Sequence, residues 1–211
     1  MIFSMHKKSI RVKLMGAFLL LSFMLLTVGS LGFFFQTQIV ENYGHIVKIN
    51  LPNAVTLGDM NQDATNMTKG LLELSLGVAK PEDAEAIKEK IKLSIDSYEK
   101  LKSQYEATKI SAQGEAEVYA PVKENWPKIK ELVLNNIELA SSIDSEKKQK
   151  FAKSYREELG PLIHDFSDNL NFVLDFQKAA SSENVENATS MSNKSNLWMS
   201  IVIITGVIFT L

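Results

Sequence analysis

The chain has 211 residues, of which 45% are hydrophobic and 23% are charged, with a formal net charge of −2. These totals resemble those of an ordinary globular protein, but two nearly charge-free blocks enclose a polar middle. That middle, residues 36–196, holds all 25 acidic residues and all but four of the 23 Lys and Arg. Its negative balance excludes a basic surface for nucleic acid, and the lack of cysteine excludes disulfides.

The first apolar block, Leu14–Phe35, contains 22 residues without a charge. As a helix it would span about 33 Å, enough for a hydrocarbon core of about 30 Å. A basic flank precedes it, with Lys7, Lys8, Arg11 and Lys13. A cleaved signal peptide is the alternative, and Val28-Gly29-Ser30 offers small residues for cleavage. The block is longer than the apolar core of about 7–15 residues in signal peptides, which favours an uncleaved anchor.

The basic residues also predict the orientation of the chain. They precede the first block and none follows it closely, so the positive-inside rule places residues 1–13 in the cytoplasm and residues 36–196 outside. A second apolar block, residues 197–211, starts at Leu197 and has 15 residues. A helix of that length is too short to cross a bilayer, so we expect a return span that continues beyond Leu211.

Between the two blocks, apolar residues recur every three or four positions, which predicts helices. The first helical run continues from the anchor, with Pro52 expected to kink it, and stops at Lys80-Pro81. The second begins at Pro81 and ends near Ile110-Ser111. The expected core positions of these two runs are Ile39, Tyr43, Ile46, Val55, Met60, Ala64, Met67, Leu71, Leu74, Val78, Ile87, Ile91, Ile95, Tyr98, Leu101 and Tyr105.

The third run contains Pro121 and Pro127, so we expect a bend and an irregular first half. The fourth has a predicted kink at Gly160-Pro161 and continues through a polar segment, which we interpret as helix rather than linker, into the second block. The core positions of these runs are Val118, Val122, Trp126, Ile129, Val133, Ile137, Ala140, Phe151, Tyr155, Leu159, Leu162, Phe166, Leu170, Val173, Phe176 and Ala180. Short connections make successive helices antiparallel. The predicted fold is all-α: a membrane-anchored up-down four-helix bundle flanked by two transmembrane helices.

This layout resembles the bacterial methyl-accepting chemotaxis proteins with a four-helix-bundle ligand-binding domain. The resemblance rests on the basic start and anchor HKKSIRVKLMGAFLLLSFMLL, the acid-rich opening of the second helix, the segment EVYAPVKENWPKIKEL and the segment YREELGPLIHDFSDNL. It implies a homodimer in the bacterial inner membrane with its bundle on the periplasmic side. The bundle would bind a small-molecule ligand or a periplasmic binding protein and control a cytoplasmic kinase complex. It implies no cofactor.

Two other classes of protein remain open. The same bundle occurs on membrane histidine kinases and diguanylate cyclases, and only residues beyond Leu211 would distinguish these from a chemoreceptor. A structural membrane-tethered coiled coil without a ligand is the third hypothesis; ligand-linked thermal stabilisation of the middle segment would argue against it.

The candidate ligand residues lie on the first helical run. Gln62, Asn66, Lys69 and Glu73 are spaced 4, 3 and 4 residues apart and therefore share one polar face. In the family that the chain resembles, basic positions in this region face the dimer partner and bind acidic ligands. Lys69 matches such a position, although arginines are missing. A solvated helix face is the alternative interpretation.

Other residues carry weaker hypotheses. His164 and Asp168 could share a helix face, but a metal site needs three or four ligands, so we predict no metal. The sequence lacks a phosphate loop and a nucleophile elbow, so we predict no catalytic residue. Trp126 and the tyrosines could line a pocket but fit a bundle core better. Trp198, at the start of the return helix, is expected to anchor it at the membrane interface.

Overall fold

The computed structural model describes residues 10–77, 81–108 and 114–210, which are helical apart from short connections. These residues contain no strand, which confirms the all-α prediction. They divide into two compact units, one formed by His45–Ser182 and the other by the segments up to Gly44 and from Glu183 onwards. Parts of three predictions lie outside the described residues: most of the basic start, Val78 as a core position, and a helix end at Ile110-Ser111.

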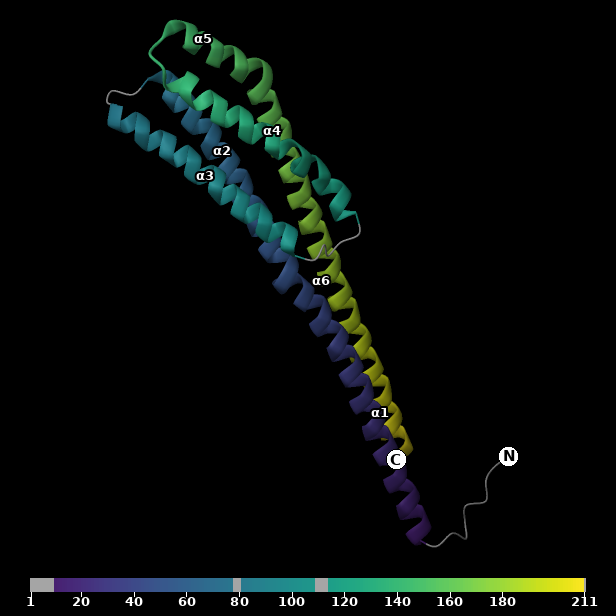
Figure 1. Ribbon diagram of the computed structural model, residues 1–211. Coiled ribbons are helices and arrows are strands. Elements are labelled where there is room, and N and C mark those ends of the chain that lie inside the picture. Colours follow the sequence, from purple (N-terminus) through teal and green to yellow (C-terminus); the bar gives the residue numbers. More distant parts are fainter. Residues whose placement is uncertain (1–9, 78–80, 109–113, 211) are drawn as a thin grey trace. The chain divides into compact units, whose positions relative to one another are not determined.

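The unit His45–Ser182 is a four-helix bundle with short connections (Figure 1). Its first three helices are α2 (Leu51–Leu76), preceded by the π-helical turn η1 (Ile46–Asn50), then α3 (Pro81–Ala107) and α4 (Glu115–Ser141). The fourth is an unbroken helical run of α5 (Ser145–Ser154), the π-helical turn η2 (Tyr155–Leu159) and the start of α6 (Gly160–Thr210). Successive helices run antiparallel, as predicted from the short connections.

The apolar residues at helical spacing form one core, as the sequence predicts. The fully or nearly buried members come from all four helices: Leu57, Met60, Ala64, Met67, Leu71, Leu74, Ile87, Ile91, Ile95, Tyr98, Tyr105, Tyr119, Val122, Trp126, Ile129, Val133, Ile137, Ala140, Phe151, Leu159, Phe166, Leu170 and Val173. The expectations for Tyr43 and Val55 are wrong, because their side chains are 48% and 57% exposed, and Leu57 is buried instead. Leu57 lies three residues before the buried Met60 and shares its helix face, whereas Val55 lies five residues before Met60 and points away from that face.

Aromatic rings fill the middle of this core. The Tyr98 and Trp126 rings stack with their centroids 3.7 Å apart. Phe166 on α6 lies 5.8 Å from Tyr98 and 6.2 Å from Trp126, measured between ring centroids. Such rings bury large apolar areas and stabilise through their preferred offsets. Three helices therefore meet at one aromatic cluster, and the interpretation of Trp126 as core is confirmed.

The four prolines inside helical runs behave in two ways. Pro52 and Pro161 each follow a π-helical turn, in which the Leu51 amide donates to the Ile46 carbonyl and the Gly160 amide donates to the Tyr155 carbonyl. Kinks were predicted at both prolines, and the structure has a π-helical turn at each place. Proline causes such turns because it interrupts the regular i to i−4 hydrogen bonds of an α-helix. A Cβ atom at Gly160 would lie 2.8 Å from the Tyr155 carbonyl oxygen, so the turn requires glycine there.

The expectation of an irregular first half for the third helix is wrong. α4 runs as one uninterrupted α-helix through Pro121 and Pro127. Pro127 lies on the exposed side of α4, where a carbonyl that loses its intrahelical donor can be hydrated. Buried residues recur every three or four positions along α4, from Tyr119 to Ala140, and pack the helix against the core over this length. Tertiary packing therefore overrides the local cost of both prolines.

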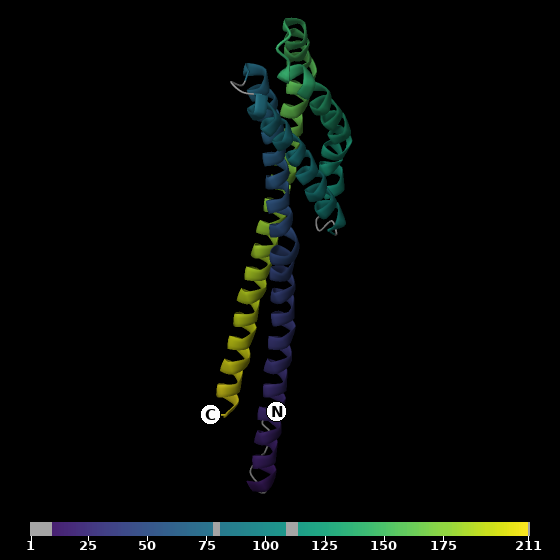
Figure 2. The same cartoon turned by 60° about the vertical axis from the view of Figure 1, so that its left-hand side comes forward.

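The second unit consists of α1 (Ile10–His45) up to Gly44 and of α6 from Glu183 onwards. Within this unit the two segments run side by side in both views (Figure 1 and Figure 2). Small side chains of α6, Ala188 and Ser195, are buried seven residues apart, and a Cβ atom at Gly206 would lie 2.7 Å from the terminal carbon of Met24. Because α6 is helical from Gly160 to Thr210, the prediction of helix rather than linker is confirmed.

Candidate functional site

The four residues predicted to bind a ligand lie on one exposed face of α2. Gln62, Asn66, Lys69 and Glu73 are all exposed, and the Gln62 side-chain nitrogen donates a hydrogen bond to the Asn66 side-chain oxygen over 3.0 Å. We call these four residues the α2 stripe. The four residues therefore share one face of α2, as their spacing predicts. Their role in ligand binding stays a prediction.

Two grooves flank the α2 stripe, and Lys69 and Glu73 line both. The groove toward α6 has a volume of about 520 Å³ and an apolar floor that includes Leu72, Leu76 and Ile163. The groove toward α3 has a volume of about 400 Å³ and is more polar, with Lys90 and Ser94 on its far side. The α2 stripe is therefore a polar ridge between two open grooves, which suits contact with another surface better than enclosure of a small molecule.

Two other predicted features also lie at the surface. The His164 Nδ1 atom is 3.5 Å from the Asp168 Oδ2 atom, and both side chains are largely exposed. The residues that the structure describes contain no group of three His, Cys, Asp or Glu that could hold a metal. Trp198 is 51% exposed within its own unit. Its role as an interface anchor stays a prediction.

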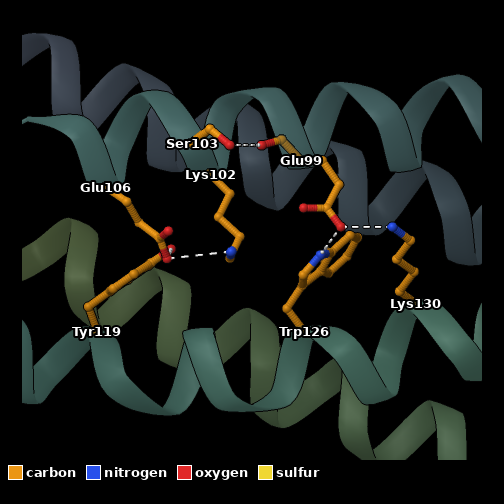
Figure 3. A network of polar contacts seen from close by, with 7 residues as sticks. All are labelled: Glu99, Lys102, Ser103, Glu106, Tyr119, Trp126 and Lys130. Atoms are coloured by element: carbon orange, nitrogen blue, oxygen red, sulfur yellow. Dashed lines mark hydrogen bonds and ion pairs between the residues drawn. The ribbon is translucent and has the colours of Figure 1, made fainter.

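A charged network joins α3 to α4 beside the aromatic cluster (Figure 3). One carboxylate oxygen of Glu99 accepts hydrogen bonds from the Trp126 indole and from the Lys130 ammonium, each over 2.9 Å. Burial alone would raise the pKa of Glu99, but these two hydrogen bonds and the Lys130 charge more than offset it and hold the pKa below its ordinary value. The network therefore fixes the Trp126 ring and keeps Glu99 ionised.

The same face carries a second set of contacts one to two turns along (Figure 3). Glu106 forms an ion pair with Lys102 over 3.5 Å and accepts a hydrogen bond of 3.4 Å from the Tyr119 hydroxyl. The Tyr119 ring lies 4.7 Å from the Tyr105 ring, centroid to centroid, with the planes tilted by 52°. The α3–α4 seam thus changes from apolar packing to polar contacts toward the end where α4 begins.

A buried polar cluster, which the sequence analysis missed, closes that end of the bundle. Glu115, the first residue of α4, is only 2% exposed. Its carboxylate accepts a hydrogen bond of 2.7 Å from the Tyr105 hydroxyl and another from the side-chain amide of Gln177 on α6. Next to it, the Thr108 hydroxyl donates to the side-chain oxygen of Asn53 on α2 over 2.9 Å. All four bundle helices therefore contribute a polar residue to this end.

Two sequence signals pointed to this cluster. Gln177 lies four residues after Val173, so it continues the stripe of Phe166, Leu170 and Val173 and occupies a core position. Glu115 directly follows Gly114, whose positive φ of 91° starts the helix, and acids are favoured in a first turn. Apolar periodicity instead predicts Phe176 as the core residue of this turn, because it gives no weight to a glutamine.

A cavity of about 220 Å³ adjoins the cluster between α3 and α4. Its lining includes Tyr105, Glu106, Thr108, Glu115, Tyr119 and Lys123. Burial, followed by the neighbouring Glu115 carboxylate, raises the pKa of the Tyr105 phenol, and burial with Glu106 raises that of Tyr119. Both phenols are therefore neutral hydrogen-bonding groups at physiological pH. We call this cavity the tyrosine pocket.

Comparison with known proteins identifies the architecture. A family model described as a four helix bundle sensory module for signal transduction matches residues 7–192. The chain belongs to this family. The match covers the whole of α1, the bundle and α6 as far as residue 192, so the module includes the helices that enter and leave the bundle. No curated protein and no solved structure matches the chain.

Membership places the chain among sensory modules for signal transduction and confirms the resemblance read from its sequence. Among the described residues, one helical run, Ile10–Leu76, is long and apolar enough to contain a membrane span, and the span lies near the N-terminus. The residues matched by the family model thus include this candidate membrane span.

The Glu99 network predicts a stability effect that depends on pH. Replacing Glu99 by Gln should lower the free energy of unfolding by about 1 kcal/mol at pH 7, a figure reduced for the partial exposure of Glu99 and Lys130. Since the folded-state pKa of Glu99 is depressed, its contribution is present above the unfolded pKa of about 4.3 and is lost as the pH falls through the folded value. The deficit should therefore shrink in acid.

Chemical denaturation of the full chain at pH 7 and in steps down to pH 3 checks this expectation. Glu124→Gln, at an exposed glutamate of α4, is the matched control and should have little effect at any pH. A Glu99→Gln deficit that stays constant across this range would show that the ionised carboxylate is not what the network stabilises.

Proposed function

We propose that the chain is the sensory and membrane-anchoring region of a bacterial chemoreceptor, which passes a stimulus across the inner membrane to a kinase-controlling module. The observation that carries the proposal is the family match from residue 7 to residue 192, which joins the N-terminal apolar helix and the bundle in one sensory module. The apolar block Leu14–Phe35 and the four basic residues before it support an anchor with the N-terminus in the cytoplasm.

The helical connections give this proposal a physical route. The residues from Ile10 to Leu76 form one helical run, and α6 continues from the bundle core to Thr210. A small displacement of α6 in the bundle would therefore move the segment that enters the second apolar block. Packed helices shift by small rigid steps, and a ligand drives such a shift only through different affinities for the two packings.

A homodimer is the second element of the proposal, with the α2 stripe facing the partner. The stripe is polar and exposed and stands between two grooves, one of them apolar, so a second copy could bury Leu72 and Leu76 while it pairs with Lys69 and Glu73. Lys69 would then lie where the two copies meet, and it supplies a positive charge for an acidic ligand or for a periplasmic binding protein.

The alternative output is a histidine kinase or a diguanylate cyclase. The described residues support the sensory module under either alternative, because both outputs use the same bundle. The type of output domain would decide between them: a long helical hairpin with Glu and Gln pairs indicates a chemoreceptor, and an ATP-binding or cyclase domain indicates the other class.

A fusion of residues 1–211 to the cytoplasmic part of a chemoreceptor of known output tests the function. Cells carrying it should show a kinase or motility response to at least one member of a panel of small carboxylates and amino acids. Lys69→Ala should raise the half-maximal concentration for acidic members by about tenfold, within the usual range of coupling energies. Lys92→Ala, at an exposed lysine on α3, is the control.

Two results would count against the proposal at different levels. A membrane-inserted fusion that responds to no compound argues against direct sensing of this panel. An unchanged response of Lys69→Ala, with an active fusion, removes the α2 stripe as the ligand site but leaves the sensory function in place.

Cysteine cross-linking tests the dimer, and the cysteine-free chain makes it simple. Single cysteines at Gln62, Asn66, Lys69 and Glu73 are introduced one at a time, and membranes are oxidised. At least one of them should form a covalent dimer at high yield, since a disulfide needs Cα atoms within about 7 Å. Cysteines at the exposed residues Lys92, Lys128 and Lys147 on other helices are the controls. Equal yields from stripe and control positions would contradict the proposed face.

A further inference from the structure

A third groove lies between the end of α2 and the segment where α5 passes into η2. Its volume is about 500 Å³, within the range of about 300–1,000 Å³ for pockets that hold small molecules. Both helical segments contribute side chains to its walls, among them Leu72, Ser75, Lys148, Phe151, Tyr155 and Arg156. We call it the α5 groove.

The α5 groove follows one face of the fourth bundle helix. Lys148 and Arg156 are eight residues apart, and Phe151, Ala152 and Tyr155 lie between them at spacings of three, four and seven from Lys148, so all five share a face. Eight residues of helix rise about 12 Å. The Phe151 and Tyr155 ring centroids lie 5.8 Å apart. The groove therefore has a cation toward each end of an aromatic middle.

The charge of the α5 groove is positive and is not neutralised by the described part of the chain. None of the described residues that line it carries a carboxylate, and Glu157 and Glu158, which follow Arg156 in the sequence, are not part of the lining. Neither Lys148 nor Arg156 forms an ion pair with a described residue. The nearby Lys150, by contrast, pairs with Glu146 over 2.8 Å.

The π-helical turn η2 shapes one wall of the groove. The Gly160 amide donates to the Tyr155 carbonyl across this turn, and a Cβ atom at Gly160 would lie 3.5 Å from the Cε1 atom of the Tyr155 ring. The lack of a side chain at Gly160 therefore leaves room for the ring beside the groove. Single π-helical turns are rare and are frequent at functional sites.

We propose that the α5 groove binds a small organic acid with two carboxylates at opposite ends of a flat apolar body. The Arg156 guanidinium, whose fork of donors matches a carboxylate, holds one end and the Lys148 ammonium holds the other, while the body lies against Phe151 and Tyr155. The lining has no carboxylate to receive an ammonium group, so an amino acid is disfavoured. The inference rests on the sensory function proposed above and adds a ligand class and a site within one copy of the chain.

The α5 groove also gives a ligand a physical connection to α6. Leu72 and Ser75 belong to α2, which is part of one helical run with the N-terminal apolar block. Tyr155 and Arg156 belong to η2, which continues directly into α6. A ligand that contacts both walls can therefore favour one packing of α2 against the fourth helix, in proportion to its different affinities for the two packings.

Calorimetric titration of terephthalate into the full 211-residue chain, held in nanodiscs of zwitterionic lipid, tests the site. Terephthalate should bind with a dissociation constant below about 1 mM, an affinity that a few charged and aromatic contacts can supply. Phthalate has the same ring and the same charge, but its carboxylates are neighbours and cannot reach both cations. It should bind at least about tenfold more weakly.

Variants separate the groove from the rest of the positive surface. Arg156→Gln and Lys148→Gln should each weaken terephthalate binding about tenfold, because each leaves one carboxylate without its partner. Lys147→Gln and Lys153→Gln remove the same charge from exposed positions of α5 outside the lining, and should change binding less than about twofold. Circular dichroism checks the fold of each variant. Lys69→Ala should leave binding unchanged, because Lys69 does not line this groove.

Several outcomes would overturn the proposal. These are no terephthalate binding to the folded wild-type chain up to about 10 mM, equal binding of phthalate, equal effects of the groove variants and the α5 controls, or loss of binding in Lys69→Ala, which would move the site to the α2 stripe. The titration needs no output domain. A failure here therefore leaves the fusion test of the sensory function intact, and a silent fusion leaves the binding result intact.

Discussion

The main physical constraint on this structure is the apolar surface of α1, which its own unit leaves exposed. Leu14, Phe18, Leu25 and Phe33 are each at least 70% exposed within their unit, and Phe35 is the buried residue of α1. A patch of this kind in water would cost about 25 cal/mol for each Å², and soluble monomers rarely carry one so large. A hydrocarbon environment removes that cost. In the proposed function, the positive-inside rule then puts the basic flank in the cytoplasm and the polar bundle on the other side of the membrane.

The interior of the bundle is apolar and tightly packed in the middle and polar at one end. Its middle is an aromatic cluster of Tyr98, Trp126 and Phe166, with Trp126 held by Glu99. One end, around Glu115, is instead built from buried polar contacts, two of whose amides have an unpartnered atom. Packed apolar seams resist deformation, whereas a buried amide atom that lacks a partner could gain a hydrogen bond in a second packing.

The α2 stripe has the opposite character. It lies on the outer face of a helix whose other side is packed into the core, so a ligand or partner there acts by adding contacts rather than by exchanging internal ones. In the proposed homodimer, binding at the α2 stripe would bias the association of two copies. The stripe lies on α2, which is part of the same helical run as the apolar N-terminal segment.

Much of the fold follows from periodicity. The core positions from Ile87 to Tyr105 and from Val122 to Ala140 were predictable because each helix buries one face, and the start of α3 at Pro81 follows from the position of proline in first turns. The effect of Pro121 and Pro127 was not predictable, since packing along the whole of α4 decides it. The prediction for Val55 was wrong because a residue five positions before Met60 does not share its helix face, whereas Leu57 does.

The site was less accessible to sequence reasoning. Polar residues such as Gln62 and Lys69 could be placed on a common face, but their neighbours on α3 and α6 come from long-range packing. Glu115 and Gln177 are 62 positions apart, and only the assembled bundle brings the carboxylate and the amide together. Their burial contradicts the expectation that polar residues lie outside, and such exceptions tend to mark sites that do more than stabilise the fold.

Labelling of single cysteines in intact cells tests the central claim, that Leu14–Phe35 lies in lipid with the bundle on the far side. A membrane-impermeant maleimide should label a cysteine at the exposed Lys150 in untreated cells, and should label one at Ile10 only after the membrane is permeabilised. Both sites labelled in intact cells, or a Lys150 cysteine found in a secreted fragment that has lost α1, would contradict the account.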